Sequence, residues 1–294
     1  MAENKLSPEA RQIVLAMQDN EITEYYIYNA IADGLKNEAD AKVLRQLATE
    51  EKHHCIIWEG YTDTGARPHR GKIFWYSFLA KVFGYTFALK LMEGGEDTAS
   101  DVYTKLSLEI PDAKVIAEDE NRHEQKLLGI LDEERLQYVG SMVLGLNDAL
   151  VELTGTLAGL TLAMQNTRLI AMAGLITGVA ATLSMASSEY LSARSDGRED
   201  AAKSCTYTGV AYCLTVAILV APYLVFGNEQ YIYAMVTMLV LAVGIIFGFT
   251  YYISVAKDLD FKKRFLEMAG ISLGVALISF IIGVFVKEFL GVDM

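Results

Sequence analysis

The sequence predicts an all-α protein of two domains, a cytoplasmic four-helix bundle over residues 1–137 and a five-helix transmembrane domain over residues 138–294. Three observations predict this fold. Residues 1–137 hold 25 of the 37 acidic residues and all four histidines. The remainder repeats apolar stretches long enough to cross a bilayer, and the whole chain contains only four prolines. A net charge of -12 without a basic surface argues against nucleic acid as a partner.

The bundle helices follow from apolar residues at 3–4 spacing over residues 7–137. Pro8 and Pro111 stand where proline can open a helix, in the first turn. A four-helix bundle whose second and third helices run parallel needs a long crossover between them, and residues 64–81 are long enough for it. The predicted helices span residues 8–35, 38–63, 82–107 and 111–136.

Each predicted bundle helix carries a glutamate on its apolar face, where an unpaired carboxylate is costly. Two of the helices carry Glu-x-x-His, which places both side chains on one face. Together these residues match the donor set of a two-metal carboxylate bundle, with bridging glutamates and one histidine nitrogen for each ion. The predicted ligands of two Fe or Mn ions are Glu21, Glu51, His54, Glu93 or Glu96 or both, Glu120 and His123.

The second helix leaves an alternative register, because Glu50 and His53 also form a Glu-x-x-His pair. We favour Glu51 and His54, since apolar residues such as Trp58 share their face. His53 is then expected at the surface.

The transmembrane helices are separated by short polar breaks from about Tyr138 onward. The breaks after the second and fourth stretches carry most of the lysines and arginines, so the positive-inside rule places the first domain in the cytoplasm and the C-terminus on the opposite side. The predicted spans are residues 139–164, 169–191, 205–226, 231–255 and 266–289. Close helix packing is predicted at the GxxxG pairs Gly155/Gly159, Gly174/Gly178, Gly244/Gly248 and Gly270/Gly274.

Four residues within these spans are candidates for a transport path. Asp148 and Glu152 share one face of the first span, and Met185 and Glu189 repeat that spacing in the second. A carboxylate in lipid is costly unless it faces a cavity, a partner or an ion. Carboxylate oxygens beside a thioether suit a first-row divalent cation. Glu189 also has a plainer interpretation, as an interfacial residue near the end of its helix.

Two segments, GLNDALVELTG (145–155) and LSMASSEYLSARS (183–195), resemble the vacuolar iron transporter family, and the resemblance extends over residues 138–294. It implies a homodimeric five-helix exporter of cytosolic Fe2+ or Mn2+, coupled to protons, with the residues matching Asp148, Met185 and Glu189 in the ion path. Eukaryotic members insert acidic helices between the second and third spans to gather metal. This chain has only residues 192–204 there, so metal loading is expected either elsewhere in the chain or not at all.

The first domain resembles the ferritin-like superfamily, closest to rubrerythrin-type domains, in ATEEKHH (48–54) and AEDENRH (117–123). The order of the two domains resembles the membrane-bound ferritin proteins of bacteria and archaea, which favours the plasma membrane of a prokaryote. The three cysteines form no CxxC pair, so neither a disulfide framework nor the rubredoxin-like tail of rubrerythrin is expected.

The leading hypothesis is a metal exporter whose bundle binds, senses or oxidises the metal. The alternative is a membrane-anchored di-iron oxidase or peroxidase, in which Tyr25, Tyr28 and Tyr103 could serve redox steps or simply pack the core. The aromatic segment from Ile73 to Phe87 is expected in the core and at a dimer contact, with contact to the membrane surface as its alternative. The fourth helix is expected to run nearly directly into the first span.

Overall fold

The computed structural model describes residues 6–94, 106–107, 109–130 and 138–290, and within these the side chains of residues 124, 128–130, 286, 287 and 290 are left undescribed. The chain divides into two compact units, Met1–Glu134 and Arg135–Met294. Every regular element within the described ranges is a helix. The prediction of an all-α protein is therefore confirmed.

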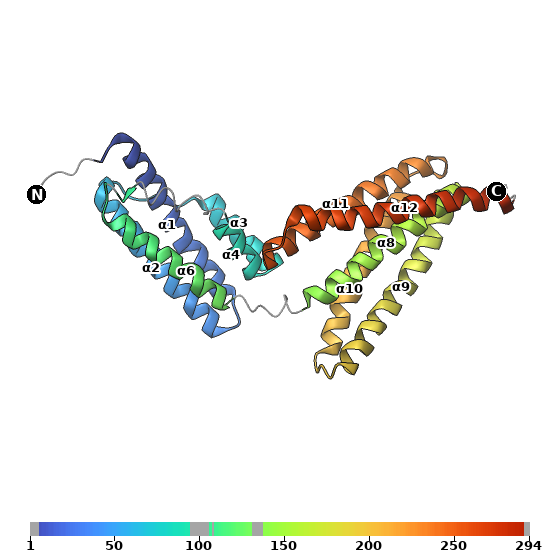
Figure 1. Ribbon diagram of the computed structural model, residues 1–294, viewed down its shortest axis with the longest axis horizontal. Coiled ribbons are helices and arrows are strands. Elements are labelled where there is room, and N and C mark those ends of the chain that lie inside the picture. The colour runs from blue at the N-terminus through green and yellow to red at the C-terminus, as the bar shows by residue number, and fades with distance from the viewer. Residues whose placement is uncertain (1–5, 95–105, 108, 131–137, 291–294) are drawn as a thin grey trace, which may run out of the picture. The chain divides into compact units, whose positions relative to one another are not determined.

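Three long helices build the N-terminal unit: α1 (Pro8–Gly34), α2 (Glu38–Thr62) and α6 (Asp112–Ile130). Ser7 caps α1 by accepting a hydrogen bond from the Ala10 amide, with Pro8 in the first turn. Figure 1 shows α1 and α2 side by side along their lengths, with α6 packed against α2. Buried aliphatic and aromatic side chains fill the space between these helices, in two clusters around Leu44 and Trp58.

The third helix expected in this unit is different in the structure. The crossover is itself largely helical, as α3 (Arg70–Phe83), and the next helix, α4 (Tyr85–Glu93), begins three residues later than predicted. Gly84 separates the two with a φ of 100°, a conformation that favours glycine and ends the helical hydrogen bonding. The predicted continuation to residue 107 falls largely outside the described residues.

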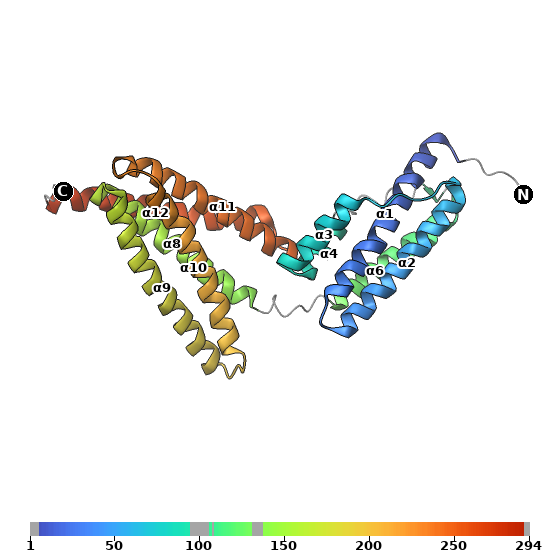
Figure 2. The same ribbon diagram turned by 180° about the vertical axis from the view of Figure 1, so that it is seen from behind.

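The C-terminal unit consists of long apolar helices with short connections. They are α8 (Val139–Met164), α9 (Thr167–Ser195), α10 (Ala201–Val225), α11 (Tyr231–Lys257, preceded by the short turn η1, Asn228–Gln230) and α12 (Phe261–Leu290). Within the described residues, five helices are long and apolar enough to cross a membrane, which confirms that prediction. Figure 2 shows α9 and α10 side by side, and α8 is the helix that packs against all four others.

Two of the four predicted GxxxG pairs, those of α8 and α9, lie close to a neighbouring helix. A Cβ at Gly155 or Gly159 would press on Ser279 of α12, and a Cβ at Gly178 would collide with Val216 of α10. The corresponding positions in the other two pairs, Gly244/Gly248 and Gly270/Gly274, have no such neighbour within 4 Å in the described structure. The GxxxG pairs of α8 and α9 therefore permit close helix approach, whereas those of α11 and α12 have no such role within this unit.

Candidate functional site

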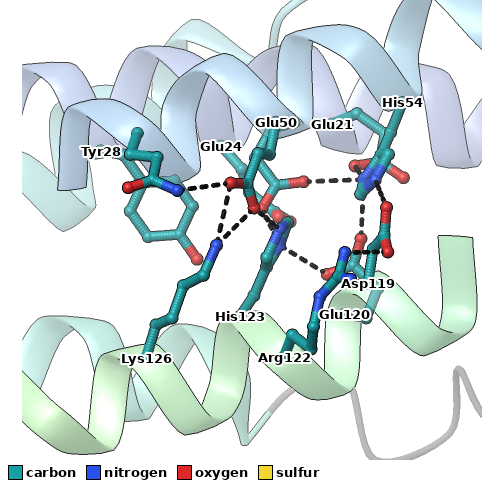
Figure 3. A network of polar contacts seen from close by, with 12 residues as sticks. Glu21, Glu24, Tyr28, Glu50, His54, Asp119, Glu120, Arg122, His123 and Lys126 are labelled. Atoms are coloured by element: carbon teal, nitrogen blue, oxygen red, sulfur yellow. Dashed lines mark hydrogen bonds and ion pairs between the residues drawn. The ribbon is translucent and has the colours of Figure 1, made fainter. Parts of the chain in front are cut away.

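Two Glu-x-x-His pairs face each other across α2 and α6. Glu51 and His54 come from α2, and Glu120 and His123 come from α6. One potential ligand atom from each of the four lies within 4.8 Å of the others. Glu51, His54 and His123 are buried, and Glu120 is half-buried. Figure 3 shows the two histidine rings and their surrounding carboxylates between the helices.

The closest atoms in this group are a nitrogen from each ring and a carboxylate oxygen. Nδ1 of His123 lies 2.9 Å from Oε1 of Glu51, and Nδ1 of His54 lies 3.0 Å from Oε1 of Glu120. Within the described part of the chain, none of these four buried atoms is aligned for a hydrogen bond. Buried polar atoms are normally hydrogen-bonded. Two nitrogens and two oxygens that converge without such bonds therefore fit a shared cation better than a structural network.

A second donor group adjoins the first. Glu21, Glu24 and Glu51 offer carboxylate oxygens within 4.8 Å of one another, and all three side chains are buried. Trp58 Nε1 donates to Oε1 of Glu21 at 3.1 Å, and the other oxygen of Glu21 lies 3.7 Å from His54 Nδ1. Glu51 belongs to both groups, which suits a carboxylate placed between two ions.

Glu24 was missed from the sequence, although a signal was present. It follows Glu21 by one helical turn and so shares its face. A systematic search for a second carboxylate three or four residues from each predicted ligand would have found it.

Carboxylates also hold the outer edge of each histidine ring. Nε2 of His54 lies 3.4 Å from Oδ2 of Asp119, and Nε2 of His123 lies 2.7 Å from Oε2 of Glu50. Lys126 Nζ donates to the same Glu50 carboxylate at 2.8 Å. This carboxylate–histidine pattern leaves Nδ1 facing the donor group, which is the arrangement that orients histidines toward a metal. Glu50 thus contacts His123 on the side of the ring that faces away from the four-residue donor group. His53, its partner in the alternative Glu-x-x-His register, is exposed.

The charges of the group are strongly interdependent. Burial opposes the charged form of His54, but the carboxylates of Glu120, Glu21 and Glu51 outweigh it and raise its pKa to about 12. Burial likewise opposes protonation of His123, and Glu120 and Glu51 raise its pKa to about 10. Without a metal, protonated imidazoles therefore balance the carboxylates.

The carboxylates respond in opposite directions. Burial disfavours the charged form of Glu51, yet contacts to His123 and His54 lower its pKa to about 2. Burial raises the pKa of Glu21 well above its usual value, and the neighbouring Glu51 and Glu120 charges add to that rise. Like-charged carboxylates this close cannot all remain ionised without cations.

The predicted ligands from the third helix do not join either donor group within the described residues. Glu93 accepts a hydrogen bond from the buried Tyr28 hydroxyl at 2.9 Å, and Glu96 lies outside the described residues. Of the other two tyrosines, Tyr25 is half-buried under the Lys52 ammonium, and Tyr103 lies outside the description.

The candidate path residues of the C-terminal unit are spread along its helices. Glu189 of α9 accepts hydrogen bonds from Ser141 Oγ of α8, at 2.6 Å, and from Ser204 Oγ of α10. Glu152 accepts from the buried Tyr212 hydroxyl at 3.0 Å. Among the described residues, no metal-ligand group of histidine, cysteine, aspartate and glutamate gathers in this unit.

The other two path candidates have less specific surroundings. Asp148 is half-buried, one turn before Glu152 on α8. Met185 packs against the apolar core of the unit, one turn before Glu189. The two glutamates therefore have different partners, two serines for Glu189 and a tyrosine for Glu152.

Comparison with known proteins identifies part of the C-terminal unit. Residues 139–204, which cover α8, α9 and the start of α10, match the model of the VIT family. With five apolar helices, this match indicates an integral membrane protein that transports a metal ion. No curated protein matches the chain. No solved structure matches it either.

Proposed function

We propose that the protein exports cytosolic Fe2+, with Mn2+ as the alternative substrate, across a prokaryotic plasma membrane in exchange for protons. The match to the VIT family over residues 139–204 carries this proposal, because the matched segment contains all four candidate path residues: Asp148, Glu152, Met185 and Glu189. Hard carboxylate oxygens and a thioether are ligands that a first-row divalent cation accepts.

The N-terminal unit is proposed to be a ferritin-like domain that holds two ions of the same metals. Glu51, His54, Glu120 and His123 would hold one ion, and Glu21, Glu24 and Glu51 the other. The unaligned buried atoms of the first group support this assignment. Glu96 remains a proposed ligand of the same centre. If the bound ions were iron, they would supply a redox couple, and if they were manganese, they would supply a fixed divalent charge.

The orientation follows from the distribution of basic residues. Basic residues lie at the end of α9, in the loop after it and at the start of α10 (Arg194, Arg198 and Lys203), and four further basic residues lie at and after the end of α11. The positive-inside rule places these ends, and the N-terminal unit, in the cytoplasm. A homodimer is proposed from the resemblance to the family.

Transport into sealed vesicles tests the path. The full chain is reconstituted, Fe2+ or Mn2+ is added on the side of the N-terminal unit, and uptake is followed with a metal-sensitive dye and an interior pH dye. We expect Asp148→Asn to abolish uptake and the associated pH change. Glu229→Gln, which makes the same change in an exposed turn, serves as the matched control. Uptake by Asp148→Asn at the rate of the parent chain would contradict the path.

A second function is a membrane-anchored di-iron oxidase or peroxidase. The buried carboxylate and histidine donors favour it, since two adjacent irons suit oxygen or peroxide reduction. Consumption of oxygen or peroxide on addition of Fe2+ to the full chain distinguishes the two functions. If oxidation occurs and vesicle uptake does not, the second function is the correct one.

A further inference from the structure

We propose that α3 is an interfacial helix that lies on a lipid bilayer with anionic headgroups and inserts its aromatic face, defined by Phe74, Trp75, Phe78 and Val82. This is a contact between the N-terminal unit and lipid, and it is independent of whether the protein exports metal. Three observations support the proposal: these side chains are exposed, the residues around them are basic, and the chain continues into helices that can cross a membrane.

The aromatic face of α3 is exposed although its opposite face is packed. Leu79 is buried, and Ile73, Tyr76 and Ala80 pack against the core of the unit. By contrast, 73% of Phe74 and 52% of Trp75 are solvent-accessible, and Phe78 and Val82 are exposed as well. The rings of Phe74 and Trp75 both stack on Phe78, at centroid distances of 6.4 and 6.1 Å. Large apolar patches of this kind mark binding surfaces.

The charge of this segment is opposite to that of the unit. Residues 64–92 contain five basic residues and no aspartate or glutamate, whereas acidic residues outnumber basic ones over residues 1–137. Arg70 and Lys81 continue the 3–4 spacing of Phe74 and Phe78, so they flank the aromatic stripe at its two ends. Lys72, on the other side of the face, donates to Asn20.

An aromatic stripe between basic residues has a preferred environment. Phenylalanine and tryptophan partition into the boundary between headgroups and acyl chains, and basic side chains reach anionic headgroups beside them. Each basic residue near such a surface adds a favourable interaction with anionic lipid. The chain is tethered to the bilayer by α8, so the helix meets lipid at a high effective concentration and a modest affinity is enough.

A second copy of the chain explains the same face less well. Two copies of α3 packed face to face about a two-fold axis would bring basic residues together, Arg70 beside its counterpart in a parallel pair or beside Lys81 in an antiparallel one. The segment contains no acidic residue that could compensate them. An anionic lipid surface satisfies both the aromatic and the basic side chains.

Tryptophan fluorescence tests this contact, because the chain contains only two tryptophans and they differ in exposure. Trp58 is fully buried in the bundle, and Trp75 lies on the aromatic face. The full chain is placed in nanodiscs of phosphatidylcholine and phosphatidylglycerol that hold either one copy or two, with or without brominated acyl chains. The Trp75→Phe variant reports Trp58 alone, so the difference from the parent chain gives the Trp75 emission.

We expect brominated lipid to remove most of the Trp75 emission and to leave the Trp58 emission unchanged. The double variant Arg70→Glu with Lys81→Glu should lose this quenching, whereas Lys36→Glu with Lys42→Glu, the same charge change at exposed sites elsewhere, should retain it. Circular dichroism checks that both double variants keep their helices. The proposal is wrong if the Trp75 emission does not change with brominated lipid. It is also wrong if aqueous iodide, which quenches solvent-exposed tryptophan, fails to quench Trp75 only in discs that hold two copies, because the face would then be covered by a second copy of the chain.

Discussion

Nδ1 of His123 lies 2.9 Å from Oε1 of Glu51, yet within the described structure the two buried atoms are not aligned for a hydrogen bond. The contact at the other edge of the ring fixes its orientation, since Nε2 of His123 lies 2.7 Å from Oε2 of Glu50. His54 is held in the same sense by Asp119. The histidines are therefore oriented before any ligand arrives, which lowers the cost of binding a cation.

Replacing the shared carboxylate should affect both ions. We expect Glu51→Gln to lose most bound metal, because Glu51 belongs to both donor groups, whereas Glu24→Gln should weaken only one of two ions. The Mn2+ content of the purified full chain, measured by elemental analysis with protein quantification, checks this. Glu38→Gln, an exposed change on the same helix, is the control. Equal metal content in the Glu51→Gln and Glu38→Gln chains would refute the shared role.

The partner behind His123 should tune affinity without being a ligand. Glu50→Gln keeps the size of the side chain but removes the charge that orients His123 and binds Lys126. Such changes typically weaken metal binding about 10–100-fold. A titration with Mn2+ should show this weakening with an unchanged number of ions bound. Loss of one ion, or no change in affinity, would show that Glu50 has another role.

Metal binding should release protons. The raised pKa values of His54, about 12, and His123, about 10, keep both rings protonated at neutral pH. A ring must lose its Nδ1 proton to bind a cation there, so the affinity rises with pH until both rings are deprotonated, more steeply below the pKa of His123 than between the pKa values of His123 and His54. Calorimetric titration with Mn2+ in buffers of different ionisation enthalpy should show about one proton released per histidine. His123→Gln should release fewer, and buffer-independent heats would contradict this account.

The contact of Glu189 with two serines predicts a separable effect on transport. Glu189→Gln removes the charge and should abolish uptake, whereas Ser141→Ala and Ser204→Ala leave the charge and remove only its hydrogen-bond donors. We expect the serine variants to change the apparent KM for Fe2+ several-fold while the maximal rate is kept. If Glu189→Gln transports like the parent, the residue is interfacial.

Close packing of α8 and α12 predicts a stability difference between two glycines. A Cβ at Gly283 would collide with the backbone of Gly159, which cannot move aside as a side chain can. Gly283→Ala should therefore lower the free energy of unfolding in detergent by about 1–3 kcal/mol. Gly244→Ala, at a position with open space, should be neutral or slightly stabilising. Equal effects of the two substitutions would rule out the contact.

The helical fold was predictable because its signals are local. Apolar periodicity, the proline at the start of α1 and the length of the apolar stretches lie within each element, and α8 has the predicted bounds. The break at Gly84 was not predicted, since apolar residues continue across it and only the backbone conformation separates α3 from α4. The prediction of close packing at Gly244/Gly248 and Gly270/Gly274 was wrong for a related reason. The motif permits close approach, but the neighbouring helices decide whether it is used.

The candidate site was predictable in part. The spacing of Glu51 with His54 and of Glu120 with His123 determines which side chains share a helix face, and the structure brings these four together. The outer contacts depend on how α2 and α6 are aligned, which no local pattern contains. The sequence therefore presents Glu50 only as an alternative ligand, whereas in the structure its carboxylate contacts the far side of the His123 ring.

The membership of Glu51 in two donor groups also bears on how the centre fills. Two positions that share a ligand cannot be occupied as independent sites. Glu51 would be held in one rotamer once a first cation was bound, and neighbouring donors would lose their protons, so a second cation would find prepared donors but also a repelling positive charge. The balance of these two terms sets the sign of the cooperativity, and through it the range of cytosolic metal concentration over which the centre passes from empty to full.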